Sequence, residues 1–431
     1  MEDAATAPRA EPARPIEINV GWTERLLRSK SDGDEEGYPL ANVYNALVAF
    51  RHAPEWQGVL WFDESRQTIV ARSAPPWEVR CIPFDWTDED DVRANAWLQS
   101  REIGVCKSVA ADAAQTVAHE HSYHPVREYL DSLDWDCTPR LDDWLVIYLG
   151  AERTEYITTV GPKFLIGAVA RIYDPGCKMD NCLVLEGPQS ALKSTALRTL
   201  AGDKFFTDDV AILGTKDAVL QIGGVWIAEL AELESIKGER HTPQVKAFLT
   251  RRVDRIRLPY GRRVVSLPRQ SVFAGSVNSQ TWLTDETGGR RFWPVSVGKI
   301  DIEGIRRDRD QLWAEARDRY RADEEWWLSA SEELCLATAE QDARYQPGPW
   351  DDKIAEYVTQ HRQEMTPVSV PQILTECIGK DLKEQTQKDA NAVAKALRHL
   401  RWERFRGIAD PITGTRQWQY RQQPKPGRIG P

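Results

Sequence analysis

The stretch Cys182-Leu-Val-Leu-Glu-Gly-Pro-Gln-Ser-Ala-Leu-Lys-Ser-Thr195 decides how the chain folds. Its apolar start, residues 182–185, predicts a buried strand, and Gly187-Pro188 predicts a turn. A helix that begins at Lys193 should follow and end at Gly202. A strand, a loop and a helix in this order gather backbone N–H groups and a lysine around a phosphate, with a hydroxyl near Mg²⁺. The stretch therefore predicts a phosphate-binding loop, or P-loop.

One residue departs from the usual pattern of such a loop. The spacing G-x-x-x-x-G-K-[ST] has glycine before the lysine, and this chain has Leu192 there. A leucine should stiffen the loop and alter its affinity for nucleotide. We expect the whole loop to bind nucleotide, namely Gly187, Pro188, Gln189, Ser190, Ala191, Leu192, Lys193, Ser194 and Thr195.

Two later apolar runs end in polar side chains that a phosphate site uses. The first ends in Glu229 and the second in Asn278. A carboxylate at the end of a strand suits Mg²⁺ and the attacking water, and Glu232 is an alternative to Glu229 for this role. The Asn278 amide should orient that water or sense the γ-phosphate of the nucleotide.

An arginine pair precedes a further strand-like run. Arg290 and Arg291 come directly before residues 292–297. An arginine in this place can stabilise the phosphoryl group that is transferred in a neighbouring subunit. The pair is therefore a candidate catalytic element that acts between subunits.

Residues 246–263 concentrate positive charge in an acidic chain. Seven basic residues stand against Asp254 alone, and Pro259-Tyr-Gly261 predicts a turn between two strands. A basic hairpin with an aromatic tip suits an element that follows a nucleic-acid backbone, although an ordinary charged face is the alternative. The candidate DNA-binding residues here are Lys246, Arg251, Arg252, Arg255, Arg257, Tyr260, Arg262 and Arg263.

Taken in order, these motifs resemble the virulence-associated protein E family, P-loop proteins of phages and bacterial genomic islands. That family is similar to superfamily 3 helicases of the AAA+ class. The resemblance covers roughly residues 183–297 and also includes Lys216-Asp217 and Asp285-Glu-Thr-Gly-Gly289. It implies that Lys193 contacts phosphates, that Ser194 and Glu229 hold Mg²⁺, and that residues 246–263 track DNA. The implied catalytic residues are Lys193, Glu229 or Glu232, Asn278 as a sensor, and Arg290 or Arg291 as a finger acting in trans.

The expected fold class is α/β, with an AAA+-like P-loop NTPase core over residues 177–300. Residues 1–37 read as a disordered tail because they are rich in Ala and Pro and then acidic. Residues 38–176 predict a mainly helical N-terminal domain, a candidate oligomerisation collar. Residues 301–348 predict a helical lid, and residues 426–431 are a short tail.

Residues 349–425 predict a winged helix-turn-helix. Thr386-Gln-Lys-Asp389 is a capping box that opens a helix, and two strand-like segments follow. The stretch 395–428 is strongly basic, so Lys395 and Arg398 on that helix are candidate DNA contacts. A protein–protein module is the alternative, because winged helices serve both roles.

The whole chain restricts the classes of function. A net charge of −10 excludes a global basic field, so any DNA contact must be local. The seven cysteines include no C-x-x-C pair, and no apolar run is long enough for a membrane span, which favours the cytoplasm of a bacterial host.

The leading hypothesis is an ATP- and Mg²⁺-dependent DNA helicase or translocase, or a replication initiator, of a phage or mobile element. It would form a ring, expected to be a homo-hexamer, with single-stranded DNA in the channel and duplex DNA on the winged helix. The alternative is a DNA-binding initiator or regulator that binds ATP with little turnover and no unwinding. A small-molecule kinase fits less well, because the sequence offers no compact substrate lid and the basic hairpin would be idle.

Overall fold

The computed structural model divides the chain into two units, Met1–Pro125 and Val126–Pro431. The predicted domain 38–176 therefore spans this boundary, and its second part packs with the P-loop sheet. Among the described residues, none of the helices combines the length and the apolar character that a membrane crossing requires. The structure describes residues 21–29, 37–78, 80–210, 215–230, 241–257, 263–278, 282, 291–344, 347–363, 366–400, 402–409 and 416–422. The predicted tails at 1–37 and 426–431 lie largely or wholly outside these ranges.

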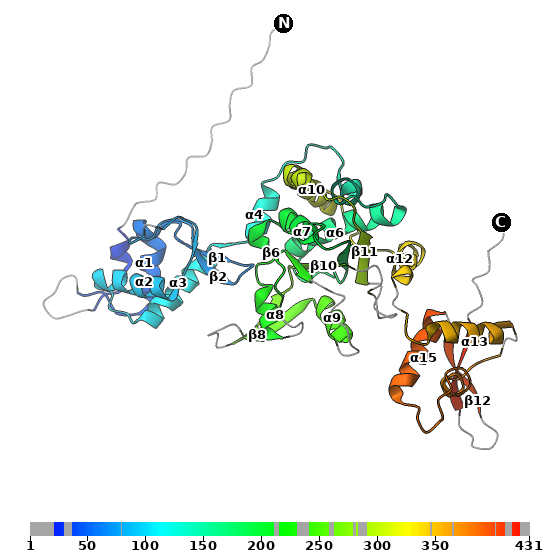
Figure 1. Ribbon diagram of the computed structural model, residues 1–431. Helices are drawn as coiled ribbons and strands as arrows, with labels where there is room; N and C mark the ends of the chain where they lie inside the picture. The colour runs from blue at the N-terminus through cyan, green and yellow to red at the C-terminus, as the bar shows by residue number, and fades with distance from the viewer. Residues whose placement is uncertain are drawn as a thin grey trace, which may run out of the picture. The chain divides into compact units, whose positions relative to one another are not determined.

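The first unit packs helices against a small mixed sheet (Figure 1). The sheet has the order β3-β2-β1-β4, and β1 pairs antiparallel with β2. Its strands are β1 (Leu60–Asp63), β2 (Thr68–Ala71), β3 (Phe84–Asp85) and β4 (Ser122–Tyr123). The helices are α1 (Val43–His52), α2 (Asp88–Ser100) and α3 (Lys107–Glu120), with short 3-10 turns at Trp22–Arg25 and Pro54–Trp56.

Local sequence explains where α2 begins. The Thr87 backbone N–H donates to the Asp90 carboxylate at 2.9 Å, and the Thr87 hydroxyl also donates to it, at 2.8 Å. This capping box satisfies backbone groups that would otherwise lack partners at the first turn of the helix. Asp90, one of four acidic residues in the first turn of α2, therefore caps the helix.

The second unit is built on a five-stranded parallel sheet, which confirms the α/β class. The strand order is β11-β5-β10-β7-β6, so the first strand in sequence, β5, lies between the last two. Parallel pairing aligns Phe273 with Cys182 and Val277 with Glu186. The strands are β5 (Cys182–Glu186), β6 (Phe206–Thr207), β7 (Ile227–Leu230), β10 (Val272–Val277) and β11 (Phe292–Ser296).

Helices cover both faces of this sheet, as parallel sheets require. Leu183 and Leu185 face the cluster formed with α6, α7 and α10, whereas Cys182 and Val184 face the cluster formed with α8 and α9. Figure 1 shows these two groups of helices on opposite sides of the strands. The helices of this unit before the sheet are α4 (Pro125–Asp131), α5 (Trp144–Leu149) and α6 (Glu155–Tyr173), with a 3-10 turn at Leu141–Asp143. Those that follow β5 are α7 (Lys193–Ala201), α8 (Lys216–Gln221), α9 (His241–Leu249) and α10 (Ile302–Arg321), with a 3-10 turn at Asp203–Phe205.

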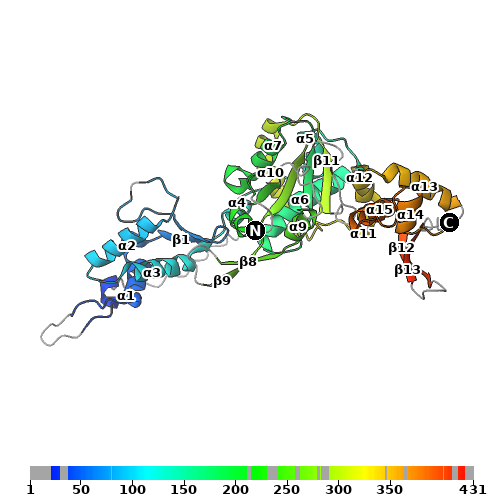
Figure 2. The same ribbon diagram turned by 60° about the horizontal axis from the view of Figure 1, so that its bottom comes forward.

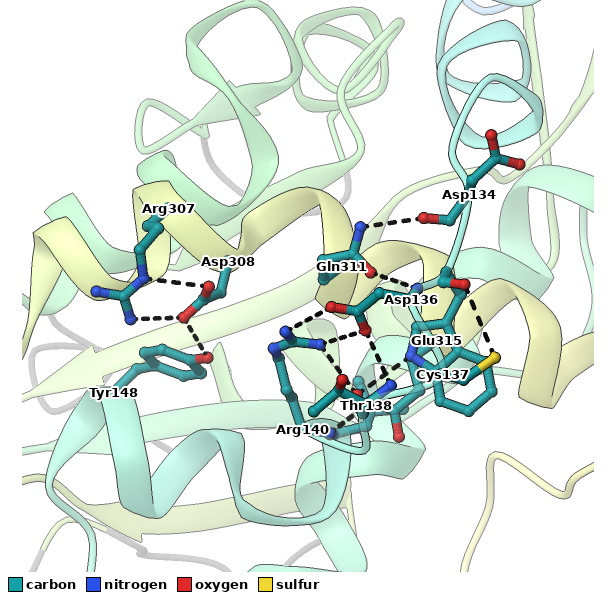
Figure 3. Close-up of polar contacts among 12 residues, drawn as sticks. Asp134, Asp136, Cys137, Thr138, Arg140, Tyr148, Arg307, Asp308, Gln311 and Glu315 are labelled. Carbon is teal, nitrogen blue, oxygen red and sulfur yellow. Dashed lines mark hydrogen bonds and ion pairs between the residues drawn. The ribbon is translucent and has the colours of Figure 1, made fainter.

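Polar contacts attach the loop between α4 and α5 to α10 (Figure 3). The Glu315 carboxylate is buried and accepts the backbone N–H groups of Arg140 at 2.7 Å and Leu141 at 3.0 Å. Gln311, one turn earlier on α10, accepts from the Asp136 N–H at 2.8 Å. These bonds satisfy the backbone of an irregular segment and attach it to the core.

The segments after α10 follow the predicted pattern of secondary structure. The expected lid contains α11 (Ala330–Glu332), a π-helix (Glu333–Ala337) and α12 (Thr338–Ala343). Trp313 is fully buried in the core, whereas Trp327 is 43% exposed.

A separate small core holds the C-terminal module, residues 351–422. Thr386 and Asp389 form the predicted capping box of α15. Its strands β12 and β13 pair antiparallel, and Figure 2 shows this hairpin projecting from α14 and α15. The elements are α13 (Asp351–Gln363), α14 (Val370–Glu376), α15 (Gln387–His399), β12 (Trp402–Ala409) and β13 (Arg416–Gln422).

Candidate functional site

The loop after β5 wraps around the lysine that opens α7. The Lys193 ammonium donates to the carbonyl oxygens of Gly187 at 2.7 Å and Pro188 at 2.9 Å. A Cβ on Gly187 would lie 2.9 Å from a methyl group of Val297, so a larger residue would force that side chain to shift. The lysine is thus held inside the loop with its charge at the first turn of a helix.

Leu192 occupies the position of the missing glycine in a left-handed conformation. Its φ is 62° and its ψ is 23°, and Ser190 has a φ of 68°. A non-glycine residue in this region carries a steric cost on the order of 1–2 kcal/mol. The Leu192 side chain is 49% exposed, so packing does not offset that cost. The backbone at position 192 thus has the left-handed conformation that favours glycine, although the residue is leucine.

Glu229 points from the sheet toward the start of α7. The Ser194 hydroxyl donates to Glu229 Oε1 at 2.8 Å, and the Glu229 side chain is fully buried. The second carboxylate oxygen, Oε2, is buried and has no hydrogen-bond partner among the described residues. A buried carboxylate oxygen normally has a partner, so this orphaned atom fits an Mg²⁺ ion or a water molecule.

Asn278 reaches the same place from β10. Because Val277 pairs with Glu186 and its carbonyl accepts the Gly187 N–H at 3.2 Å, the residue after β10 lies beside the loop. The Asn278 side-chain oxygen accepts from the Lys193 ammonium at 3.2 Å. Ligands of parallel α/β sheets bind outside the carboxyl ends of the strands, which is where these groups meet. The structure therefore brings together four predicted residues, Lys193, Ser194, Glu229 and Asn278.

A buried ion pair beneath the loop was not predicted. Glu186, directly before Gly187, accepts from the Arg344 guanidinium, from Trp282 Nε1 at 2.7 Å and from the Ser296 hydroxyl at 2.9 Å. Burial alone would lower the pKa of Arg344, but its bonds to Glu186 and Glu340 outweigh burial and raise that pKa. The position of Glu186 at the end of an apolar strand was visible in the sequence, but the sequence does not indicate that Arg344 is its partner.

Arg291 lies away from the loop of its own chain. It precedes Phe292, which pairs with Cys182 at the amino-terminal start of β5, whereas the loop follows Glu186. Four residues of strand separate these positions by about 13 Å. The Arg291 guanidinium is 3.9 Å from the Asp180 carboxylate. The alternatives Glu232 and Arg290 lie outside the described residues.

The basic segment forms a hairpin, with its predicted turn outside the described part of the chain. β8 (Val253–Arg257) pairs antiparallel with β9 (Val264–Pro268). Arg255 and Arg257 are exposed on one face of β8, and Arg263 is exposed directly before β9. The predicted Tyr260 and Arg262 lie outside the described residues.

Two of the predicted DNA-binding arginines have partners inside the chain. Arg251 pairs with Asp254 at 3.1 Å, and Arg252 donates to the Gly176 carbonyl at 2.6 Å. Asp254 also pairs with the buried Arg269 at 2.9 Å. These contacts anchor the base of the hairpin, and a DNA contact by Arg251 or Arg252 stays a prediction.

The remaining candidate cations lie on helices. Lys246 is half-buried on α9, and burial together with the charge of Arg291 lowers the pKa of Lys246 to about 8. On α15, Arg398 is exposed and Lys395 is half-buried. An ammonium with this pKa loses its charge as the pH rises through about 8, so the pH dependence of DNA binding can report a phosphate contact of Lys246.

Comparison with known proteins gives a family and distant structural neighbours. The family profile described as a virulence-associated protein E-like domain matches residues 130–346. The apo structure of the NrS-1 C-terminal region aligns with 88% of this chain and 98% of its own, at 10% identity and a TM-score of 0.47. A second structure of that region, its A form, aligns with 84% of this chain and 96% of its own, at 10% identity and a TM-score of 0.44. No curated protein gives a significant match.

Proposed function

The chain belongs to the virulence-associated protein E-like family, and from this we propose that it is an ATP-dependent DNA helicase or translocase, or a replication initiator, of a phage or mobile genetic element. The observation that carries the proposal is the convergence of Lys193, Ser194, Glu229 and Asn278 at the carboxyl end of a parallel sheet. An ammonium, a hydroxyl, a carboxylate and an amide in this arrangement suit the cleavage of a nucleoside triphosphate.

Each of the four groups has a distinct task in this proposal. Lys193 exchanges its loop carbonyl and amide acceptors for phosphate oxygens, and Asn278 is then free to orient water or sense the γ-phosphate. Ser194 and Glu229 would hold Mg²⁺, which neutralises charge on the phosphates when bound. Glu229 polarises the attacking water through its second oxygen, the buried atom that has no partner among the described residues.

The proposal includes hydrolysis between subunits of an AAA+-like ring, which we expect to be a hexamer. Arg291 stands about 13 Å along the strand direction from the loop of its own chain. An arginine so placed serves the nucleotide of a neighbouring copy rather than its own. A ring in which each copy completes the site of the next is consistent with this separation.

DNA would meet the protein at two places. Arg255, Arg257 and Arg263 on the β8–β9 hairpin are exposed and are proposed to follow a single strand in the channel. The C-terminal module has three helices and a two-stranded hairpin, which support a winged helix, and Lys395 and Arg398 on α15 are its proposed duplex contacts.

The experiment is a comparison of ATP hydrolysis and strand separation by the wild type and by Lys193→Ala. The wild type should hydrolyse ATP faster with single-stranded DNA and separate a forked duplex, and Lys193→Ala should do neither. Arg93→Ala, which removes an exposed cation of α2 that pairs with Glu89, serves as the control for altered charge. Robust unwinding by Lys193→Ala would reject the motor.

The second candidate is an initiator or regulator that binds ATP with little turnover. The left-handed Leu192 and Ser190 favour it, because a strained loop resists the adjustments that accompany phosphate release. Tight ATP binding with negligible hydrolysis, with or without DNA, would select this candidate over the motor.

A further inference from the structure

The C-terminal module contains a groove of about 380 Å³ between its hairpin and two of its helices. One wall is the face of α15 that carries Gln387, Asn391 and two alanines, and the other is the hairpin. We call it the C-terminal groove. Its lining residues are Val370, Pro371, Gln387, Ala390, Asn391, Ala394, Arg404, Trp418 and Tyr420, and this lining contains no carboxylate.

The hairpin wall holds two guanidinium groups against one indole. The guanidinium carbons of Arg404 and Arg406 lie 4.0 Å and 4.2 Å from the centroid of the Trp418 ring. Antiparallel pairing of Arg406 with Trp418 and of Arg404 with Tyr420 puts these side chains on one face of the hairpin. The electron-rich indole face offsets the mutual repulsion of the two cations and holds them in place.

Trp418 and Arg404 are available to a ligand. Trp418 is 41% exposed, which is unusual for so large an aromatic side chain. Arg404 is exposed and makes no hydrogen bond or ion pair with any described residue. The wall thus offers flat cationic and aromatic surfaces on which a planar ring can stack.

The helix wall of the groove offers hydrogen-bonding groups. The Gln387 amide nitrogen donates to the Asn391 side-chain oxygen at 3.0 Å. In this arrangement the Gln387 oxygen and the Asn391 nitrogen have no partner among the described residues, so one acceptor and one donor remain side by side. The Watson–Crick edge of every nucleobase carries both a donor and an acceptor, and an unpaired base exposes that edge. Ala390 and Ala394 keep the space between the walls open.

We propose that the C-terminal groove binds an unpaired base of single-stranded DNA. The base stacks against the Trp418–Arg404 pair, the two amides hydrogen-bond to its edge, and Arg406 lies near the adjoining phosphate. A concave site of this size accepts one flat ring, which a paired and stacked duplex does not present. The inference extends the proposed DNA function and differs from it, because it requires neither ATP nor a ring.

The test measures binding of a short single-stranded oligonucleotide to the full chain without nucleotide, by fluorescence anisotropy. Trp418→Ala and Arg404→Ala should each weaken binding roughly 5- to 100-fold, the range for one lost stacking contact. Arg421→Ala is the matched control, because Arg421 lies on the opposite face of the hairpin near Glu403 and its loss removes the same charge. The affinity of Arg421→Ala for the oligonucleotide should fall by no more than about threefold.

The probe itself supplies a second measurement. The fluorescence of a single 2-aminopurine in the oligonucleotide should be quenched when that base stacks in the groove. With an abasic residue at the same position, the wild type and Trp418→Ala should bind the oligonucleotide with equal affinity. Asn391→Ala, a change at an exposed helix position, should also weaken binding, and circular dichroism verifies folding of each variant.

Several outcomes would overturn the inference. They are equal losses for Arg421→Ala and Trp418→Ala, tight binding of the abasic strand, or an equal effect of Trp418→Ala on a blunt duplex. Lys193→Ala should bind the oligonucleotide as the wild type does. If the wild type shows this binding pattern but no ATPase activity, the motor is rejected and the groove is kept, so the two failures are distinguishable.

Discussion

The Arg344 Nε atom lies 2.9 Å from both carboxylate oxygens of Glu186, the residue directly before the first glycine of the phosphate loop. Arg344 belongs to the turn that ends α12, and Glu186 ends β5. The Glu186 and Arg344 side chains are only 2% and 12% exposed. The pair therefore joins the helical segment after the sheet to the base of the loop.

Breaking this pair should destabilise the second unit strongly. Arg344→Met leaves a buried carboxylate without its cation, and such losses cost about 3–5 kcal/mol. The double variant Glu186→Gln/Arg344→Met should recover part of this cost, because no buried charge remains uncompensated. Urea unfolding measures the free energies. Arg93→Ala, which breaks an exposed pair with Glu89, should change stability little, and additive losses in the double variant would contradict the prediction.

Substitutions at Leu192 should separate backbone strain from side-chain chemistry. Glycine adopts the left-handed conformation without steric cost, so Leu192→Gly should stay within about 1 kcal/mol of the wild type and bind ATP at least as tightly. Leu192→Val should lose about 1–2 kcal/mol, because a β-branched side chain is least tolerated at positive φ. Thermal unfolding and nucleotide titration test both variants. Equal stability of the glycine and valine variants would contradict the prediction, because it would show that residue 192 can leave the left-handed conformation at no cost.

Glu229→Gln should separate nucleotide binding from hydrolysis. The amide keeps the shape and an acceptor for Ser194 but loses the charge that polarises water. We expect ATP affinity within a few-fold of the wild type and hydrolysis slower by about 10²–10⁴-fold. Steady-state hydrolysis and equilibrium binding are the two measurements. If Glu229→Gln hydrolyses ATP near the wild-type rate, another acidic residue must polarise the attacking water, and Glu232 is the first to test.

Lys246 should make DNA binding sensitive to pH in the mildly alkaline range. Its folded-state pKa is lowered to about 8, so the free protein carries this charge below pH 8 and loses it above. If Lys246 contacts a DNA phosphate, binding must first restore the proton, and affinity should fall above pH 8 by at most about tenfold per pH unit. Lys246→Arg should remove this dependence, since arginine stays charged. Identical pH profiles of both proteins would exclude the contact.

Glu315 should be a structural anchor of the loop before α5. Glu315→Ala would leave the N–H groups of Arg140 and Leu141 unpaired, at a cost of about 1–3 kcal/mol for each buried group. Glu303→Ala on the same helix is the control, because that carboxylate is 79% exposed. Hydrogen exchange of residues 134–141 should rise in the first variant only. Unchanged protection of the loop in Glu315→Ala would contradict this role.

Local sequence determined the helices and strands whose boundaries are set by residues close to them in the chain. The apolar run before Gly187 and the Lys193-Ser194 start of a helix predicted the strand, the loop and the helix in the right places. The capping box at Thr386 likewise predicted the start of α15. The order of polar-ended strands also identified Glu229 and Asn278 as members of one site, because parallel strands in this class end at one edge.

Tertiary structure decided the matters that depend on partners distant in the chain. The Glu186–Arg344 pair joins residues 158 positions apart, and no local pattern specifies such a partner. The basic segment offered equivalent arginines, yet the fold uses Arg251 and Arg252 to anchor the hairpin and leaves Arg255 exposed. Residue type and spacing set what a side chain can do, whereas strand register and helix packing set which neighbour it meets, and that neighbour decides between a structural and a functional role.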